Sequence, residues 1–232
     1  MFAGHKLRRA GGAKIVRSVT YLGSYSDAVT KAAYDFNGID LGPDTPNRMI
    51  IITSTGWGNV RNTQNIKLNG SNMIKQSQSS DGSANATAPC VAIRKNSGST
   101  TGDIQVNYNG NVNGCVMSVF NMETGADAPL YQAAGTLNGA SGATMILNDV
   151  VVDVDTAVFC AAGSSTTAAG NLGWTGVDNA EKQHDVTLNN HRAVHGWVRD
   201  ITVASTTDDL SYTGASGVKA MAVISVAFDD KP

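Results

Sequence analysis

The chain has 232 residues, of which 25 are glycine and only 16% are charged, and its formal net charge is −2. So few long charged side chains leave little material for solvated helix faces, and the many small polar residues favour short strands and turns. No segment approaches the ~20 apolar residues of a membrane span, and the N-terminus lacks the apolar core of a secretory signal. The composition therefore argues against a helical protein, and the length fits one large all-β domain or two small ones.

Charge is unevenly placed along the chain. Residues 1–116 carry 12 Lys and Arg against 6 Asp and Glu, which gives +6, whereas residues 117–232 carry 5 against 13, which gives −8. Such asymmetry either orients a protein on a partner or on copies of itself, or reflects chance clustering on solvated loops.

The first 17 residues form a basic segment without any acid. Its cations are Lys6, Arg8, Arg9, Lys14 and Arg17. Three glycines argue against a stable helix, so an extended N-terminal arm over residues 1–17 is predicted. The arm either docks on an acidic protein surface or is a loosely packed terminus. Phe2 is its single aromatic residue, which disfavours base stacking and therefore a nucleic-acid partner.

About 13 strands follow, separated by Gly, Asn and Pro turns. In chain order the main candidates are Lys14–Leu22, Ala32–Leu41, Met49–Thr53, Asn65–Leu68, Asn72–Gln76, Cys90–Lys95, Ile104–Tyr108, Cys115–Phe120, Ala143–Leu147, Val150–Val154, Ala157–Ala162, His184–Leu188, His191–Val203 and Val218–Phe228. Short hairpins are expected at Leu68 to Asn72 and at Leu188 to His191. Asp208–Gly217 is predicted to be a loop.

The stretch Thr101–Gly125 shows the pattern most clearly. Apolar residues alternate with polar ones over Ile104–Tyr108, as in a strand with one face in water. The Cys115–Phe120 run is almost wholly apolar, which is typical of a strand covered on both faces. Since a Gly/Asn cluster separates the two, a hairpin of one exposed and one buried strand is predicted.

Together these elements predict an antiparallel β-sandwich, of jelly-roll type, with little or no helix. No linker or change in composition divides the chain, so a single β-sandwich domain over residues 18–232 is predicted. No internal repeat is evident.

Three cysteines, Cys90, Cys115 and Cys160, lie among apolar or small residues. An odd number with wide spacing favours buried free thiols, although one disulfide would leave a third thiol over. Free thiols fit synthesis in a reducing cytoplasm.

Catalytic patterns are scarce. His191 and His195 are four residues apart, with His184 near them across a predicted turn, so a three-histidine metal site competes with ordinary cross-strand histidines. The acids Asp149, Asp153 and Asp155 either form a carboxylate pair or mark a solvent-facing strand side. No phosphate-binding or nucleophile-elbow motif occurs. We expect no enzyme activity, no catalytic residues, no metal and no cofactor.

Trp57, Trp174 and Trp197 each adjoin a glycine. A flat aromatic face beside glycine can stack on a sugar ring, and it serves equally well in the core or rim of a sandwich. Trp174, in a predicted Gly-flanked loop, is the leading candidate for glycan contact.

Four stretches carry a resemblance to a family of tailed-bacteriophage virion proteins: YDFNGIDLGPDTPNRMIIITSTGWG, DIQVNYNGNVNGCVMSVFNMETG, NLGWTGVDN and KAMAVISVAF. They cover roughly a third of the chain and have middling specificity. The resemblance implies an accessory structural protein on the head, neck or tail, made in the bacterial host cytoplasm and located in the virion. It defines no site residues.

From these observations we expect a head decoration, spike, fibre or tail-associated protein that assembles with itself, as a trimer or pentamer. Its basic arm is expected to dock on a capsid, connector or tail protein. The alternative is a carbohydrate-binding module for host recognition, which would use the tryptophans and a surface glycan.

Overall fold

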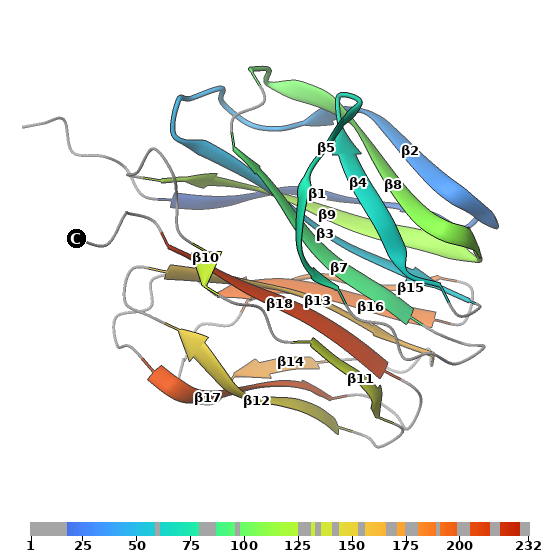
Figure 1. Cartoon of the computed structure of the whole chain (residues 1–232), viewed down its shortest axis with the longest axis vertical. Coiled ribbons are helices and arrows are strands. Elements are labelled where there is room, and N and C mark those ends of the chain that lie inside the picture. The colour runs from blue at the N-terminus through green and yellow to red at the C-terminus, as the bar shows by residue number, and fades with distance from the viewer. Residues whose placement is uncertain are drawn as a thin grey trace, which may run out of the picture.

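Four antiparallel β-sheets lie one above another in the computed structural model of this chain (Figure 1). The structure describes residues 18–58, 61–78, 87–95, 98–124, 131–132, 136–140, 144–152, 156–165, 171–174, 181–188, 191–198, 205–213 and 219–227. The N-terminal half supplies two sheets and the C-terminal half supplies the other two, so each half forms a sandwich of its own. The all-β prediction is confirmed, and these residues contain no helix.

Each sandwich has one inner sheet, which faces the other sandwich, and one outer sheet. The N-terminal inner sheet has the order β1 (Ser18–Asp27), β9 (Gly114–Glu123), β3 (Arg48–Trp57), β7 (Thr87–Lys95) and β6 (Ile74–Gln78). The N-terminal outer sheet has the order β2 (Lys31–Asp40), β8 (Thr101–Val112), β4 (Thr63–Leu68) and β5 (Ser71–Asn72).

The C-terminal inner sheet has the order β10 (Tyr131–Gln132), β18 (Lys219–Ala227), β13 (Thr156–Ser164), β16 (His191–Val198) and β15 (Glu181–Leu188). A further strand, β11 (Thr136–Ala140), also pairs with β18. The C-terminal outer sheet has the order β12 (Thr144–Val152), β17 (Ser205–Thr213) and β14 (Asn171–Trp174).

Both strands predicted within Thr101–Gly125 exist, but they do not form a hairpin. β8 pairs with β2 and β4 in the outer sheet, whereas β9 pairs with β1 and β3 in the inner sheet. The turn at Asn113 therefore carries the chain from one layer to the next. This explains the two patterns: β8 alternates because one of its faces meets water, and β9 is apolar because both of its faces are covered.

Two apolar layers hold neighbouring sheets together. The first fills the N-terminal sandwich and includes Tyr34, Phe36, Ile50, Ile52, Ile66, Val106, Tyr108 and Val119. The second lies between the two inner sheets and includes Met49, Ile51, Phe120, Met122, Phe159, Ile224 and Val226. Because the inner sheets are buried on both faces, every residue of β3 and every residue of β13 is buried.

Several boundaries differ from the predictions. The hairpin β15–β16 is confirmed, and so is the turn after Leu68, with Asn69 and Gly70 at φ of 50° and 75°. The predicted second strand Asn72–Gln76 is wrong, because after this turn only β5 pairs back with β4, and β6 pairs with β7 in the inner sheet. The predicted break at Asn148-Asp149 is a register shift inside the continuous strand β12. The predicted loop from Asp208 is wrong, because β17 runs through Thr213 and pairs with β12 and β14.

The two sandwiches have the same strand order, although no repeat is evident in the sequence. In the inner sheets β1-β9-β3-β7-β6 corresponds to β10-β18-β13-β16-β15, and in the outer sheets β2-β8-β4 corresponds to β12-β17-β14. The prediction of an antiparallel β-sandwich is confirmed, and the strand order shows that sandwich twice in succession. Its jelly-roll type and the single domain over residues 18–232 stay predictions, and the predicted arm over residues 1–17 lies outside the described residues.

Candidate functional site

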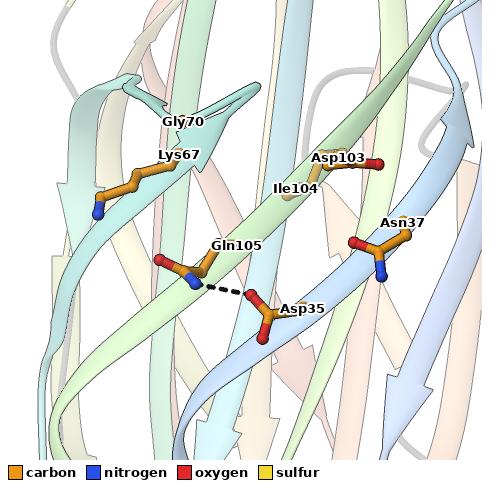
Figure 2. A pocket seen from close by; sticks show the side chains of 7 residues that line it. All are labelled: Asp35, Asn37, Lys67, Gly70, Asp103, Ile104 and Gln105. Carbon is orange, nitrogen blue, oxygen red and sulfur yellow. Dashed lines mark hydrogen bonds between the residues drawn. The ribbon is translucent and has the colours of Figure 1, made fainter.

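The open face of the N-terminal outer sheet carries a polar groove of about 280 Å³. Figure 2 shows its side chains, which come from three adjacent strands. The lining residues are Asp35, Asn37, Lys67, Gly70, Asp103, Ile104 and Gln105. The alternation of β2 and β8 produces this surface, because their apolar residues point into the sandwich and their Asp, Asn and Gln residues point outward.

Hydrogen bonds fix the orientation of these polar groups. The Gln105 amide donates to Asp35 Oδ1 at 2.6 Å, across the β2–β8 pair (Figure 2). Asn107 Nδ2 donates to Gln105 Oε1 at 3.0 Å and to Asn65 Oδ1 at 2.7 Å. Asp103 Oδ1 accepts from the backbone N–H of Gly38 at 2.8 Å. The face thus offers ordered carboxylate and amide groups, which are suited to hydrogen bonding with the hydroxyl groups of a polar ligand.

Trp57 does not provide the aromatic platform considered from the sequence. Its side chain is 1% exposed, and its ring stacks on His191 with centroids 5.8 Å apart. A Cβ on Gly114 would clash with the Trp57 ring, so this glycine lets the ring pack against β9. Trp57 is therefore a core residue, because β3 is covered on both faces.

The other two tryptophans lie on strands. Trp174 is the last residue of β14, opposite Leu210, and is not in a loop. Trp197 lies on β16, opposite Phe159. Their side chains lie outside the described residues, so their predicted glycan contact stays a prediction. The same holds for docking by the arm cations Lys6, Arg8, Arg9, Lys14 and Arg17.

His195 lies fully buried between the two inner sheets. Its Nε2 is 3.0 Å from Thr55 Oγ1 on β3, and its Nδ1 is 2.8 Å from Ser118 Oγ on β9. Both ring nitrogens are therefore occupied by hydroxyl groups of the opposite sandwich. A histidine beside a serine resembles a nucleophile and its base, but Ser118 is also fully buried, which leaves no space at this pair for a substrate.

The three-histidine metal site considered from the sequence stays untested, because the side chain of His184 lies outside the described residues. His195 bonds to hydroxyl groups, and His191 stacks on Trp57. In the described part of the chain no group of three or more His, Cys, Asp or Glu residues could hold a metal ion. Asp149 lies on β12, and residues 153 and 155 lie outside the described ranges, so the carboxylate-pair hypothesis is untested.

All three cysteines are free and buried, as predicted. Desolvation by burial raises the pKa of Cys90 and of Cys115 to about 12, and it also raises the pKa of Cys160. The Tyr108 hydroxyl donates to Cys115 Sγ at 3.3 Å. Because the thiolate is the reactive form, these thiols are packing groups and not nucleophiles at neutral pH.

Two features escaped the sequence reasoning. The alternating run Ile104–Tyr108 contained the signal for the polar face, but only strand pairing shows that Asp35 and Lys67 flank Gln105. The buried role of His195 had a weaker signal, its place in a strand with β-branched neighbours. Its partners Thr55 and Ser118 are 140 and 77 residues away in sequence, so no local pattern connects them.

Comparisons with known proteins find little. No family model matches the chain, and no curated protein matches it. Among solved structures, the major capsid protein P2 from bacteriophage PM2 matches with a TM-score of 0.28 and 11% identity, over 91% of this chain and 97% of that chain. A similarity at this level carries no argument. No helix in the described residues is long and apolar enough to cross a membrane.

Proposed function

We propose that this protein is a non-enzymatic structural component of a tailed-phage virion or phage-like particle. The observation that carries the proposal is the strand order of the N-terminal sandwich. The first strand lies beside the last and the second beside the penultimate (β1–β9 and β2–β8), with β3 and β4 next to them in two facing sheets. This order supports a jelly roll, a fold used by viral capsid and lectin domains.

The repeated strand order supports two such jelly rolls in one chain, packed through inner sheets that are covered on both faces. Two sandwiches packed in this way would form a rigid subunit, which suits a structural role in a particle. Fold alone does not define activity, and the phage context comes from the resemblance of four sequence stretches. In the proposal the basic arm docks on a capsid, connector or tail protein, and the sandwiches self-assemble as a closed oligomer.

Deletion of residues 1–17 tests the arm. We expect the truncated chain to fold normally and to be missing from particles, because five cations and no acid occupy this segment. Gradient-purified particles from producing cells would be probed for the full-length and truncated chains. A variant with all five cations replaced by glutamine serves as a control for length.

If particles carry as much of the truncated chain as of the full-length chain, docking by the arm is contradicted. Absence of both chains from all particles would contradict the virion role itself, so the two failures are distinguishable.

The polar groove favours a second candidate function, recognition of a glycan on the N-terminal outer sheet. We expect Gln105→Ala to weaken glycan binding about tenfold, because Gln105 holds both Asp35 and Asn107 in place. Binding of the full chain to a glycan array measures this, with Thr20→Ala, an exposed position on β1, as the matched control. If the full chain binds no glycan, the second function fails and the structural role stands.

A further inference from the structure

The contact between the two sandwiches has apolar packing on both sides of a polar line. On one side, the side chains of β3, β7 and β9 pack on those of β13 and β18, and on the other Trp57 and Val116 pack with Ala193. Between them, five side chains form a line of hydrogen bonds. This line, here called the imidazole seam, consists of Tyr21, Ser24, Ser118, His195 and Thr55.

The seam is continuous. The Tyr21 hydroxyl and Ser24 Oγ are 2.6 Å apart, and Ser24 Oγ and Ser118 Oγ are also 2.6 Å apart. Ser118 then meets His195 Nδ1, and His195 Nε2 meets Thr55. Four of these residues belong to the N-terminal sandwich, and His195 is the single member from the C-terminal sandwich. The imidazole therefore bridges the two sandwiches.

In the neutral imidazole one ring nitrogen donates a hydrogen bond and the other accepts one. The hydroxyl groups of Ser118 and Thr55 satisfy both roles. Protonation makes both nitrogens donors, so the hydroxyl group that donates to the accepting nitrogen must turn and accept instead. If that hydroxyl group is Ser118, the hydrogen bonds from Ser118 to Ser24 and from Ser24 to Tyr21 must change direction as well. Protonation also places a charge in a fully buried site, which is unfavourable because hydroxyl dipoles replace water only in part.

Other titratable groups lie near the seam. Tyr21 is its partly exposed end on β1, and His191, four residues before His195, stacks on Trp57. On β15 the strand register places His184 opposite His195, and it places Asp185 opposite Val194, the residue before His195. The seam-facing side chains of β3 and β9 are hydroxyl groups, and on β13 the residue opposite His195 is Ala161.

We propose that the imidazole seam is a pH-sensitive latch, in which neutral His195 holds the two sandwiches together and its protonation loosens their contact. An unfolded histidine binds its proton near pH 6.5. In the proposal, the folded seam excludes the proton that the unfolded chain binds. The stability that the seam contributes is therefore complete above about pH 6.5, and it is lost as the pH falls below this value. This device is independent of the proposed virion role.

The experiment compares the full chain with His195→Gln, whose amide can still donate and accept. Urea unfolding is measured at pH 7.5, 6.5 and 5.5. Relative to the variant, the wild-type unfolding constant is expected to rise up to about tenfold per pH unit below about pH 6.5, because one proton is taken up on unfolding. His191→Gln, at a partly exposed position on the same strand, is expected to keep the wild-type pH dependence.

Equal pH dependence of the wild type and His195→Gln would overturn the proposal. If the variant does not fold, a ¹⁵N NMR titration of the wild-type imidazoles decides: His195 is expected to stay neutral while the protein is folded, and ordinary titration near pH 6.5 without structural change would overturn the latch. Hydrogen exchange locates the opening. After correction for intrinsic rates, acid is expected to raise exchange in β9 and β16 before it does so in β2 and β8.

Discussion

Replacing Arg48 with methionine is expected to lower the free energy of unfolding by about 3–5 kcal/mol, because the change removes a buried, paired guanidinium and the hydrogen bonds that it donates to several partly buried carbonyl groups. The Arg48 side chain is fully buried at the start of β3. Its Nη1 donates to the carbonyl groups of Gly42 and Pro43 at 3.0 and 2.9 Å, and its Nη2 donates to that of Ser99 at 2.7 Å.

The same guanidinium forms an ion pair with Asp44 at 2.9 Å. Arg48 thus ties the β2–β3 turn to the β7–β8 turn, and methionine can fill part of its volume but satisfy none of its acceptors. Urea unfolding of both proteins at pH 7 measures the effect. Arg94→Met is the matched control: Arg94 is only partly buried and donates to one carbonyl, that of Leu68 at 2.6 Å, so a loss of about 1.5 kcal/mol is expected.

A loss for Arg48→Met no larger than the loss for Arg94→Met would show that water or a local shift replaces the guanidinium. Arg48→Lys sharpens the test. Lysine keeps the charge but has a single nitrogen, so it cannot reach both turns, and most of the loss is expected to remain.

The second large effect concerns Trp57. Trp57→Ala is expected to cost about 3–5 kcal/mol, because it opens a cavity among tightly packed residues at the contact between the sandwiches. Trp57 packs with Val116 and Ala193 and stacks on His191, so both sandwiches contribute to its surroundings. Thermal unfolding followed by circular dichroism measures the loss.

Ile74→Ala serves as the control for Trp57→Ala. Ile74 is a large apolar residue on β6, but it is 59% exposed, so its loss is expected to change stability by less than about 0.5 kcal/mol. A Trp57→Ala variant that unfolds like the wild type would contradict the buried position of this ring. If that variant also loses binding to a glycan, Trp57 is a ligand residue.

The sequence does not show the role of either residue. Nothing in the local sequence singles out Arg48, because the acceptors of its guanidinium come from two separate turns that only the fold brings together. The glycines beside Trp57 left open whether its ring meets a ligand or packs in the core. The structure decides for the core, where a third glycine, Gly114, provides room for the ring.

Local sequence patterns were enough to identify the class of fold. Period-two alternation in β8 and unbroken apolar runs in β3, β9 and β13 identified strands, and they separated half-covered strands from fully covered ones. These signals are local, because a strand's own residues report how many of its faces meet water. For the same reason the burial of the three thiols was predictable.

Strand pairing and the contacts between distant side chains became apparent only in the folded protein. The partition of β8 and β9 into different sheets, the matching strand order of the two halves, and the position of His195 against Ser118 and Thr55 all depend on contacts between distant segments. Strand pairing is set by the summed packing of whole faces and not by any short motif. Chain-local patterns therefore predict layers and burial, whereas the polar groove and the imidazole seam arise from the way those layers are stacked.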